Sequence, residues 1–172
     1  LEYHKYLLYS YPANEEAVRT LRTIKRREQK PFAVMFKDIE KIRKSSFVSD
    51  TEANLLQSSP KPIMLLEHRP LSELQAVIDS EMKGRSCREY GKSRFIGSFL
   101  PSMGFQYMLL AYTGMPLIVT SANPSDMPII KADDEIKAFN EGKEGLVSAN
   151  LYNERDIRVR VDDSVVRAID GQ

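Results

Sequence analysis

Cysteine and long apolar runs are scarce in this chain, and both shortages exclude classes of protein. The single cysteine, Cys87, rules out an internal disulfide and a cysteine-rich zinc site, a composition that suits a reducing compartment. No apolar run approaches the length of a membrane span, and the first residues lack the apolar core and cleavage site of a signal peptide. We therefore expect a soluble, cytoplasmic protein.

Several motifs that mark common chemistries are also missing. Without a glycine-rich phosphate loop or a G-x-G-x-x-G motif, any nucleotide would have to be held by side chains and scattered backbone amides. No G-x-S-x-G motif supports a serine hydrolase. His4 and His68 have no cysteine or carboxylate at metal-ligand spacing, so we predict no metal ligands. The formal net charge of +1 does not by itself indicate a nucleic-acid-binding protein.

The segments that are present alternate between helix-like and strand-like patterns over 172 residues, a length that fits one domain. Capping residues and helical periodicity predict helices that begin at Asn14, at Ser49, near Leu71, at Phe105 and at Asp133. Apolar runs predict buried strands at 31–36, 63–66 and 116–120, and residues 157–169 resemble a hairpin. This order favours an α/β domain with a mainly parallel sheet that ends in an antiparallel pair.

The densest group of cations lies at the end of the first predicted helix and comprises Lys25, Arg26, Arg27 and Lys30. Cations in the last turn of a helix complement its dipole, which is a purely structural role. Alternatively, Lys25 and Arg27 bind phosphates or a carboxylate through charge-assisted hydrogen bonds. Charge alone leaves both interpretations open.

The stretch TSANPSD, residues 120–126, follows the third predicted strand. Its small polar residues and its proline are typical of a turn, but they are also suited to meeting a ligand at a strand end. Arginines recur near the end of the chain, at positions 155, 158, 160 and 167. Arg158 and Arg160 share one face of a strand, which is typical of a solvated face and equally suits a polyphosphate.

Three segments, at 14–35, 116–128 and 155–167, occur in an order and spacing that resemble the YrdC-like domain of the hydrogenase-maturation carbamoyltransferases HypF. They are more distantly similar to the threonylcarbamoyl-AMP synthases. The resemblance implies a single YrdC-like domain over 1–172, with a divergent stretch at 1–13 and an insertion-like segment at 67–94. It also implies a twisted mixed α/β sheet with flanking helices around a concave, cationic cavity.

The resemblance implies an ATP-dependent nucleotidyltransferase or carbamoyltransferase-type enzyme. Such a protein converts ATP and a carbamoyl or carbamate-type acid into pyrophosphate and an acyl-adenylate, either carbamoyl-adenylate or threonylcarbamoyl-adenylate. Mg²⁺ would accompany ATP, and a protein is a possible acyl acceptor. Lys25 and Arg27 would be the catalytic, phosphate-binding pair. The whole implied nucleotide site comprises Lys25, Arg27, Lys30, Thr120, Ser121, Asn123, Arg160 and Ser164.

The sequence also departs from the family pattern. Residues 1–8 contain no glycine where the family has a glycine-rich segment, so we expect the first strand to be altered or missing. Gln106 and Tyr107 replace paired histidines, and Asp126 stands where the family has glycine. The other domains of HypF are not recognised in the sequence. We therefore expect either a stand-alone relative or a remnant that has lost activity.

A binding module for double-stranded RNA or tRNA is the alternative from a different functional class. A basic segment contributes Arg85, Arg88, Lys92 and Arg94 to such an interface. Binding of this kind weakens steeply with salt, because the neutralised phosphates release counterions.

Overall fold

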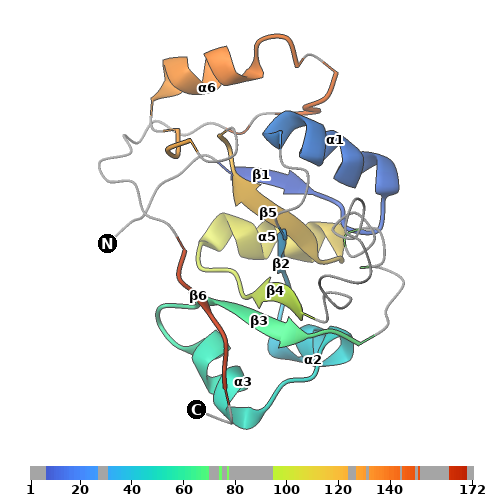
Figure 1. The fold of residues 1–172 in the computed structure, drawn as a ribbon, viewed down its shortest axis with the longest axis vertical. Helices are drawn as coiled ribbons and strands as arrows, with labels where there is room; N and C mark the ends of the chain where they lie inside the picture. Colours follow the sequence, from blue (N-terminus) through green and yellow to red (C-terminus); the bar gives the residue numbers. More distant parts are fainter. Residues whose placement is uncertain are drawn as a thin grey trace, which may run out of the picture.

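The computed structural model describes residues 7–26, 31–69, 74, 77, 95–123, 127–130, 132–143, 145–149, 151 and 163–169. The strands are β1 (Leu7–Ser10), β2 (Ala33–Met35), β3 (Ile63–Glu67), β4 (Phe95–Phe99), β5 (Leu117–Ser121) and β6 (Val165–Val166). The helices are α1 (Glu15–Lys25), α2 (Ile39–Ser45), α3 (Asp50–Gln57), α5 (Gly104–Thr113) and α6 (Asp133–Asn140). Figure 1 shows α2 and α3 at one end of the molecule and α6 at the other.

The strands form one mixed sheet in the order β1-β5-β2-β4-β3-β6. The pairs β1–β5, β2–β5 and β3–β4 are antiparallel, whereas β2–β4 and β3–β6 are parallel. The prediction of a mainly parallel sheet was therefore wrong. It rested on unbroken apolar runs, and such runs arise wherever helices cover both faces of a strand, whatever its direction.

Three further elements differ from the sequence-based expectation. Strand β1 is present and pairs with β5, although we expected the first strand to be altered or missing. Strand β4 and helix α2 were not expected: β4 contains Gly97 and Ser98, which interrupt its apolar pattern, and α2 is only two turns long. Strand β6 pairs with β3; the other half of the expected hairpin, 157–161, lies outside the described residues.

The predicted helix signals are confirmed where the structure describes them. The Asn14 side chain accepts a hydrogen bond from the amide of Ala17 at 3.0 Å and caps α1. Ser49 and Glu52 form a reciprocal capping box at the start of α3. Gly114 ends α5 in the left-handed conformation with a φ of 69°. No helix in the described ranges is long and apolar enough to cross a membrane.

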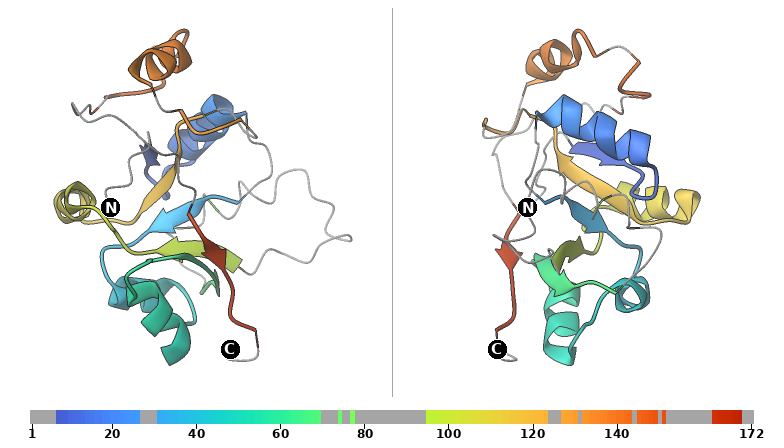
Figure 2. Two further views of the ribbon diagram at one scale, coloured as in Figure 1. Left: turned by 90° about the vertical axis from the view of Figure 1, so that its left-hand side faces the viewer. Right: turned by 45° about the vertical axis from the view of Figure 1, so that its right-hand side comes forward.

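Alternation along the strands divides the sheet into two faces, which we call the α1 face and the α5 face. On the α1 face, Val34, Met64 and Ile118 are fully buried against side chains of α1, α2 and α3. On the α5 face, Leu110 of α5 packs against Met35 and against the inward side chains of β5. Figure 2 shows α5 and α1 on different sides of the strands. Both faces therefore bury apolar residues, as the runs of the sequence predict.

Candidate functional site

Lys25, the last residue of α1, reaches the end of β5 nearly a hundred residues further along the chain. Its side chain is almost completely buried, with 2% of the residue exposed. Its Nζ donates hydrogen bonds to the carbonyl of Ser121 at 2.6 Å, the carbonyl of Asn123 at 2.5 Å and Asn123 Oδ1 at 2.8 Å. We call these three residues the Lys25 cluster.

Asn123 completes the cluster through both ends of its side-chain amide. Its Oδ1 also accepts from the hydroxyl of Ser121 at 2.5 Å, and its Nδ2 donates to the carbonyl of Met127. Asn123 is 6% exposed, so these bonds satisfy polar atoms that have little access to water. These bonds tie Asn123 to the end of α1 and to Met127.

Burying an ammonium group is costly unless its donors are paired. The three oxygens around Lys25 Nζ match the three N–H donors of a lysine, and all of them are neutral acceptors. The chain then turns away through Arg26, whose φ of 49° is left-handed. Lys25 therefore brings a positive charge to the end of β5 and shapes the backbone there.

The other predicted site residues do not all meet at this cluster. Thr120 is half-buried and lies on the α1 face, because it alternates with Ser121 along β5. Ser164 is exposed next to edge strand β6, and its carbonyl accepts from the amide of Ile63 at 2.9 Å. The remaining predictions, Arg27, Lys30 and Arg160, lie outside the described residues. The structure thus unites Lys25, Ser121 and Asn123, and it places Ser164 at a different strand.

A second buried polar group joins α5 to β1. Gln106 Oε1 accepts from the amides of Ser102 at 3.0 Å and Met103 at 3.2 Å, and its Nε2 donates to the hydroxyl of Tyr9 at 3.2 Å. Sequence reasoning noted Gln106 only as a replaced histidine. Gln106 is the third residue of α5, a position from which a glutamine side chain commonly caps the start of a helix. The sequence could have predicted this capping role from that position.

The hydroxyl of Tyr9 stays protonated at neutral pH. Burial raises the pKa of Tyr9 to about 12; the hydrogen bond from Gln106 lowers it somewhat, and the charge of Asp163 raises it further. Asp163 precedes β6, whereas Tyr9 belongs to β1 at the opposite edge of the sheet. In a flat sheet these edges would stand about 24 Å apart, five strand spacings. Asp163 lies in the segment before β6 and not in the strand itself, so its charge reaches Tyr9 without any requirement on the shape of the sheet.

Metal ligands were not predicted from the sequence. Within the described ranges, no group of three or more histidine, cysteine, aspartate or glutamate side chains could hold a metal ion.

Comparison with protein families matches residues 5–172 to the Sua5/YciO/YrdC model, which carries the description "Telomere recombination". The carbamoyltransferase HypF2 of Cupriavidus necator is 34% identical over 173 residues, which cover 92% of this chain and 20% of that protein. The chain therefore spans about a fifth of the length of this curated relative.

Solved structures agree with this match. A full-length HypF in a phosphate- and nucleotide-bound form superimposes with a TM-score of 0.74 and 32% identity, over 94% of this chain and 23% of that one. Sua5 from P. abyssi, complexed with L-threonine, superimposes with a TM-score of 0.70 at 17% identity, over 95% and 44% of the two chains. At this low identity, the likeness to Sua5 shows only that the two chains share a fold.

Proposed function

Because the chain belongs to the Sua5/YciO/YrdC family, we propose that it binds ATP and converts a carbamate-type acid into a carbamoyl adenylate. The observation that carries the proposal is the Lys25 cluster, which joins two of the sequence motifs in one buried constellation. The acid is inferred from the relatives: the chain is 34% identical to a HypF carbamoyltransferase and only 17% identical to the threonine-bound Sua5. A carbamoyl group is therefore favoured over threonylcarbamoyl.

The reaction is an adenylyl transfer. A carboxylate oxygen of the acid attacks the α-phosphorus of ATP, the bond to the bridging oxygen breaks, and pyrophosphate leaves with that electron pair. Such a step needs positioned cations and hydrogen-bond donors rather than covalent help from the protein. Because its three donors are engaged, Lys25 would act mainly by holding Ser121 and Asn123 and by its charge. Ser121 is half-buried, and its hydroxyl donates to Asn123 Oδ1.

The remaining members of the site are proposed on the family pattern. Arg27, Lys30 and Arg160 would supply cations to the triphosphate. Thr120, which lies on the α1 face, would support the neighbouring Ser121, and Ser164 would stand beside edge strand β6. Magnesium would enter as the complex with the phosphates of ATP, a mode that asks for few protein ligands.

Pyrophosphate release tests the proposal. The purified chain is incubated with MgATP and ammonium carbamate, or with MgATP, bicarbonate and L-threonine, and we expect pyrophosphate only with carbamate. Ser121→Ala should slow release by about tenfold or more, as expected for loss of a donor in the site. Ser59→Ala, an exposed serine in the turn after α3, is the matched control and should leave the rate unchanged.

Two outcomes would contradict the proposal. ATP binding without pyrophosphate from either acid would favour an inactive remnant, and an absence of ATP binding would remove the nucleotide site altogether. The alternative of RNA binding depends on Arg85, Arg88, Lys92 and Arg94, which lie outside the described residues. It stays a prediction, tested by retention of an RNA duplex at low salt and its loss as salt rises.

A further inference from the structure

A row of side chains crosses the α5 face from one edge of the sheet toward the other. The strand register places Tyr9 opposite Val119, Val119 opposite Ala33, Ala33 opposite Gly97, and Gly97 opposite Leu65. Continuing the pairing of β6 with β3 by one residue sets Arg167 beside Leu65. Val166 packs into the core of the α1 face, so its neighbour Arg167 must point to the α5 face.

Within the described ranges, helix α5 covers only part of this face. Its apolar contacts involve β1, β5, Met35 and Phe99, whereas Ala33, Leu65 and Phe95 are half-buried and fall outside that cluster. The middle of the uncovered part carries the small residues Ala33 and Gly97. Ser121 lies on the same face, at the β5 side, because it follows Val119 by two residues.

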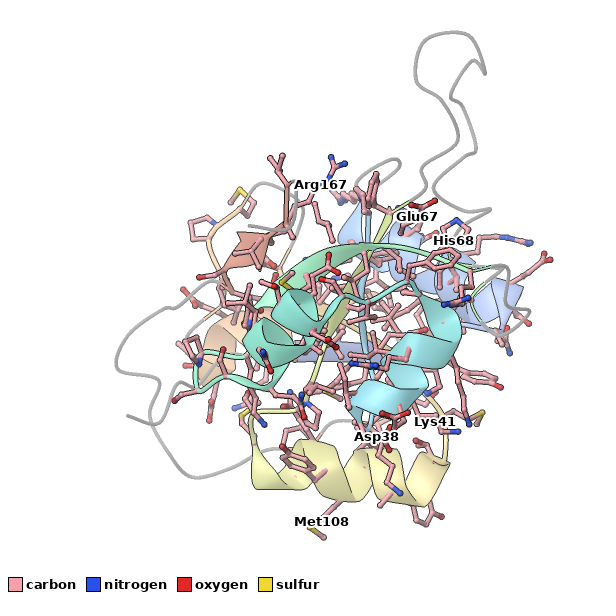
Figure 3. The ribbon with its side chains drawn as sticks, turned by 90° about the horizontal axis from the view of Figure 1, so that it is seen from below. Asp38, Lys41, Glu67, His68, Met108 and Arg167 are labelled. Atoms are coloured by element: carbon pink, nitrogen blue, oxygen red, sulfur yellow. The ribbon has the colours of Figure 1, made fainter. Side chains whose placement is uncertain are left out.

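The guanidinium of Arg167 is stacked on an aromatic ring at the far side of this surface. Its central carbon lies 4.0 Å from the centroid of the Phe95 ring. Arg167 is exposed, so one side of its planar group rests on Phe95 while the other is accessible. Figure 3 shows Arg167 and Glu67 at the end of the molecule opposite Met108 of α5. A planar cation fixed in this way is suited to stacking on a second π system.

The two sides of this surface carry different charges, so they favour different parts of a nucleotide. Near Arg167, Glu67 occupies the same face next to Phe95, so a carboxylate offsets the arginine and disfavours a polyphosphate there. At the other side, the positive charge of Lys25 in the Lys25 cluster favours phosphates. In a flat sheet, β5 and β6 would stand about 19 Å apart, and curvature of the sheet shortens this span.

We infer that Arg167, stacked on Phe95, binds the adenine base of the nucleotide, whose phosphates point toward Ser121. The inference rests on the proposed function and assigns the orientation of ATP across the α5 face. The base would lie on the outer side of the guanidinium, so that adenine, arginine and phenylalanine form one stack. No phosphate contact is required of Arg167.

Calorimetric titration of the full chain with MgATP, AMP and tripolyphosphate tests this orientation. Arg167→Ala should weaken ATP and AMP about tenfold, as expected for loss of a desolvated cation–π contact, and should leave tripolyphosphate unchanged. Arg167→Lys keeps the positive charge but removes the planar guanidinium group, so it should not restore the binding of ATP and AMP. Phe95→Leu should weaken ATP and AMP in the same sense. Arg43→Ala is the matched control, because it removes an exposed arginine from α2 on the α1 face.

The failures of the two proposals can be told apart. If the wild-type chain binds ATP and AMP and Arg167→Ala binds them equally well, the inference is overturned and the proposed function stands. If Arg167→Ala weakens tripolyphosphate as much as ATP, Arg167 is a phosphate ligand and the inferred orientation is wrong. If wild type binds no ATP, both are overturned. Unchanged thermal unfolding of each variant shows that the fold is intact.

Discussion

At the scale of single residues, Lys25 has the helix-terminal position that the sequence predicted, and its predicted role in binding phosphates or a carboxylate stays a proposal. It lies in the last turn of α1, where a cation complements the helix dipole, and it also meets the Ser121–Asn123 motif. What the sequence could not reveal is that its ammonium binds protein oxygens directly. Lys25 is thus first a residue that shapes the site, and any effect on a phosphate passes through Ser121, Asn123 and the long-range field of its charge.

Replacing Lys25 by methionine should lower the free energy of unfolding by about 2 kcal/mol, because three buried acceptors lose their donor while the desolvation cost of the ammonium is relieved. Urea denaturation measures the change. Arg19→Ala, an exposed position on the same helix, should stay within about 0.5 kcal/mol of wild type. A methionine variant as stable as wild type would mean that the Lys25 cluster does not hold the two motifs together.

At the scale of elements, helix α5 connects β4 to β5 and is delimited by a glycine at each end. Gly104 opens the helix and Gly114 closes it, and no heavy atom lies within 4 Å of a Cβ built on either. The two positions differ in backbone conformation, since only Gly114 has a positive φ, of 69°. Gln106 then caps the amides of the first turn and ties the helix to Tyr9. The helix is therefore placed by its ends as well as by its apolar face.

The two glycines give a matched pair of substitutions. Gly104→Ala should stabilise the chain by about 0.5 kcal/mol, because alanine restricts the unfolded chain and fits a helical φ. Gly114→Ala should destabilise it by about 1 kcal/mol, because the left-handed conformation penalises a Cβ. Thermal or urea unfolding of both variants measures the difference. Equal effects at the two ends would show that the left-handed cap does not decide where α5 ends.

At the scale of the whole molecule, the sheet relates residues that are far apart in its strand order. Tyr9 on edge strand β1 responds to the charge of Asp163, which precedes the other edge strand, β6. Helices on the α1 face fill one side, and α5 covers part of the other. Among the residues that the structure describes, the part of the α5 face that α5 leaves uncovered lies between Ser121 and Arg167, the place proposed for ATP.

The raised pKa of Tyr9 predicts a loss of stability at high pH. Its pKa is about 12 in the folded chain and 10.0 in the reference state, so the unfolded chain releases this proton first. The free energy of unfolding should be unaffected by Tyr9 below pH 10 and should fall between pH 10 and 12, by at most about 1.4 kcal/mol per pH unit. Urea titrations across this range measure the slope.

Tyr9→Phe is the control for that slope, because the other tyrosines titrate in the same range. The variant should lose the hydrogen bond from Gln106 but show a shallower decline above pH 10. Asp163→Asn should lower the pKa of Tyr9 and move the start of the decline to lower pH. A decline that is identical in wild type and Tyr9→Phe would contradict the burial of this phenol.

The sequence by itself determined the local features of this protein, because these depend on neighbouring residues. Asn14, Ser49 and Gly114 mark helix ends, and the apolar runs at 31–36, 63–66 and 116–120 became β2, β3 and β5. Motif order, likewise a property of the chain, was enough to indicate the family. Strand β4 was missed because glycine and serine interrupt its pattern.

Only the tertiary structure decided which way the strands run and which candidate residues meet. Burial on both faces makes parallel and antiparallel strands look alike in sequence, so the mixed pairing could not be read from apolar runs. The contacts of Lys25 with Ser121 and Asn123, and of Arg167 with Phe95, join segments about a hundred or about seventy residues apart. Such contacts depend on how the sheet folds and curves, which no local pattern of residues specifies.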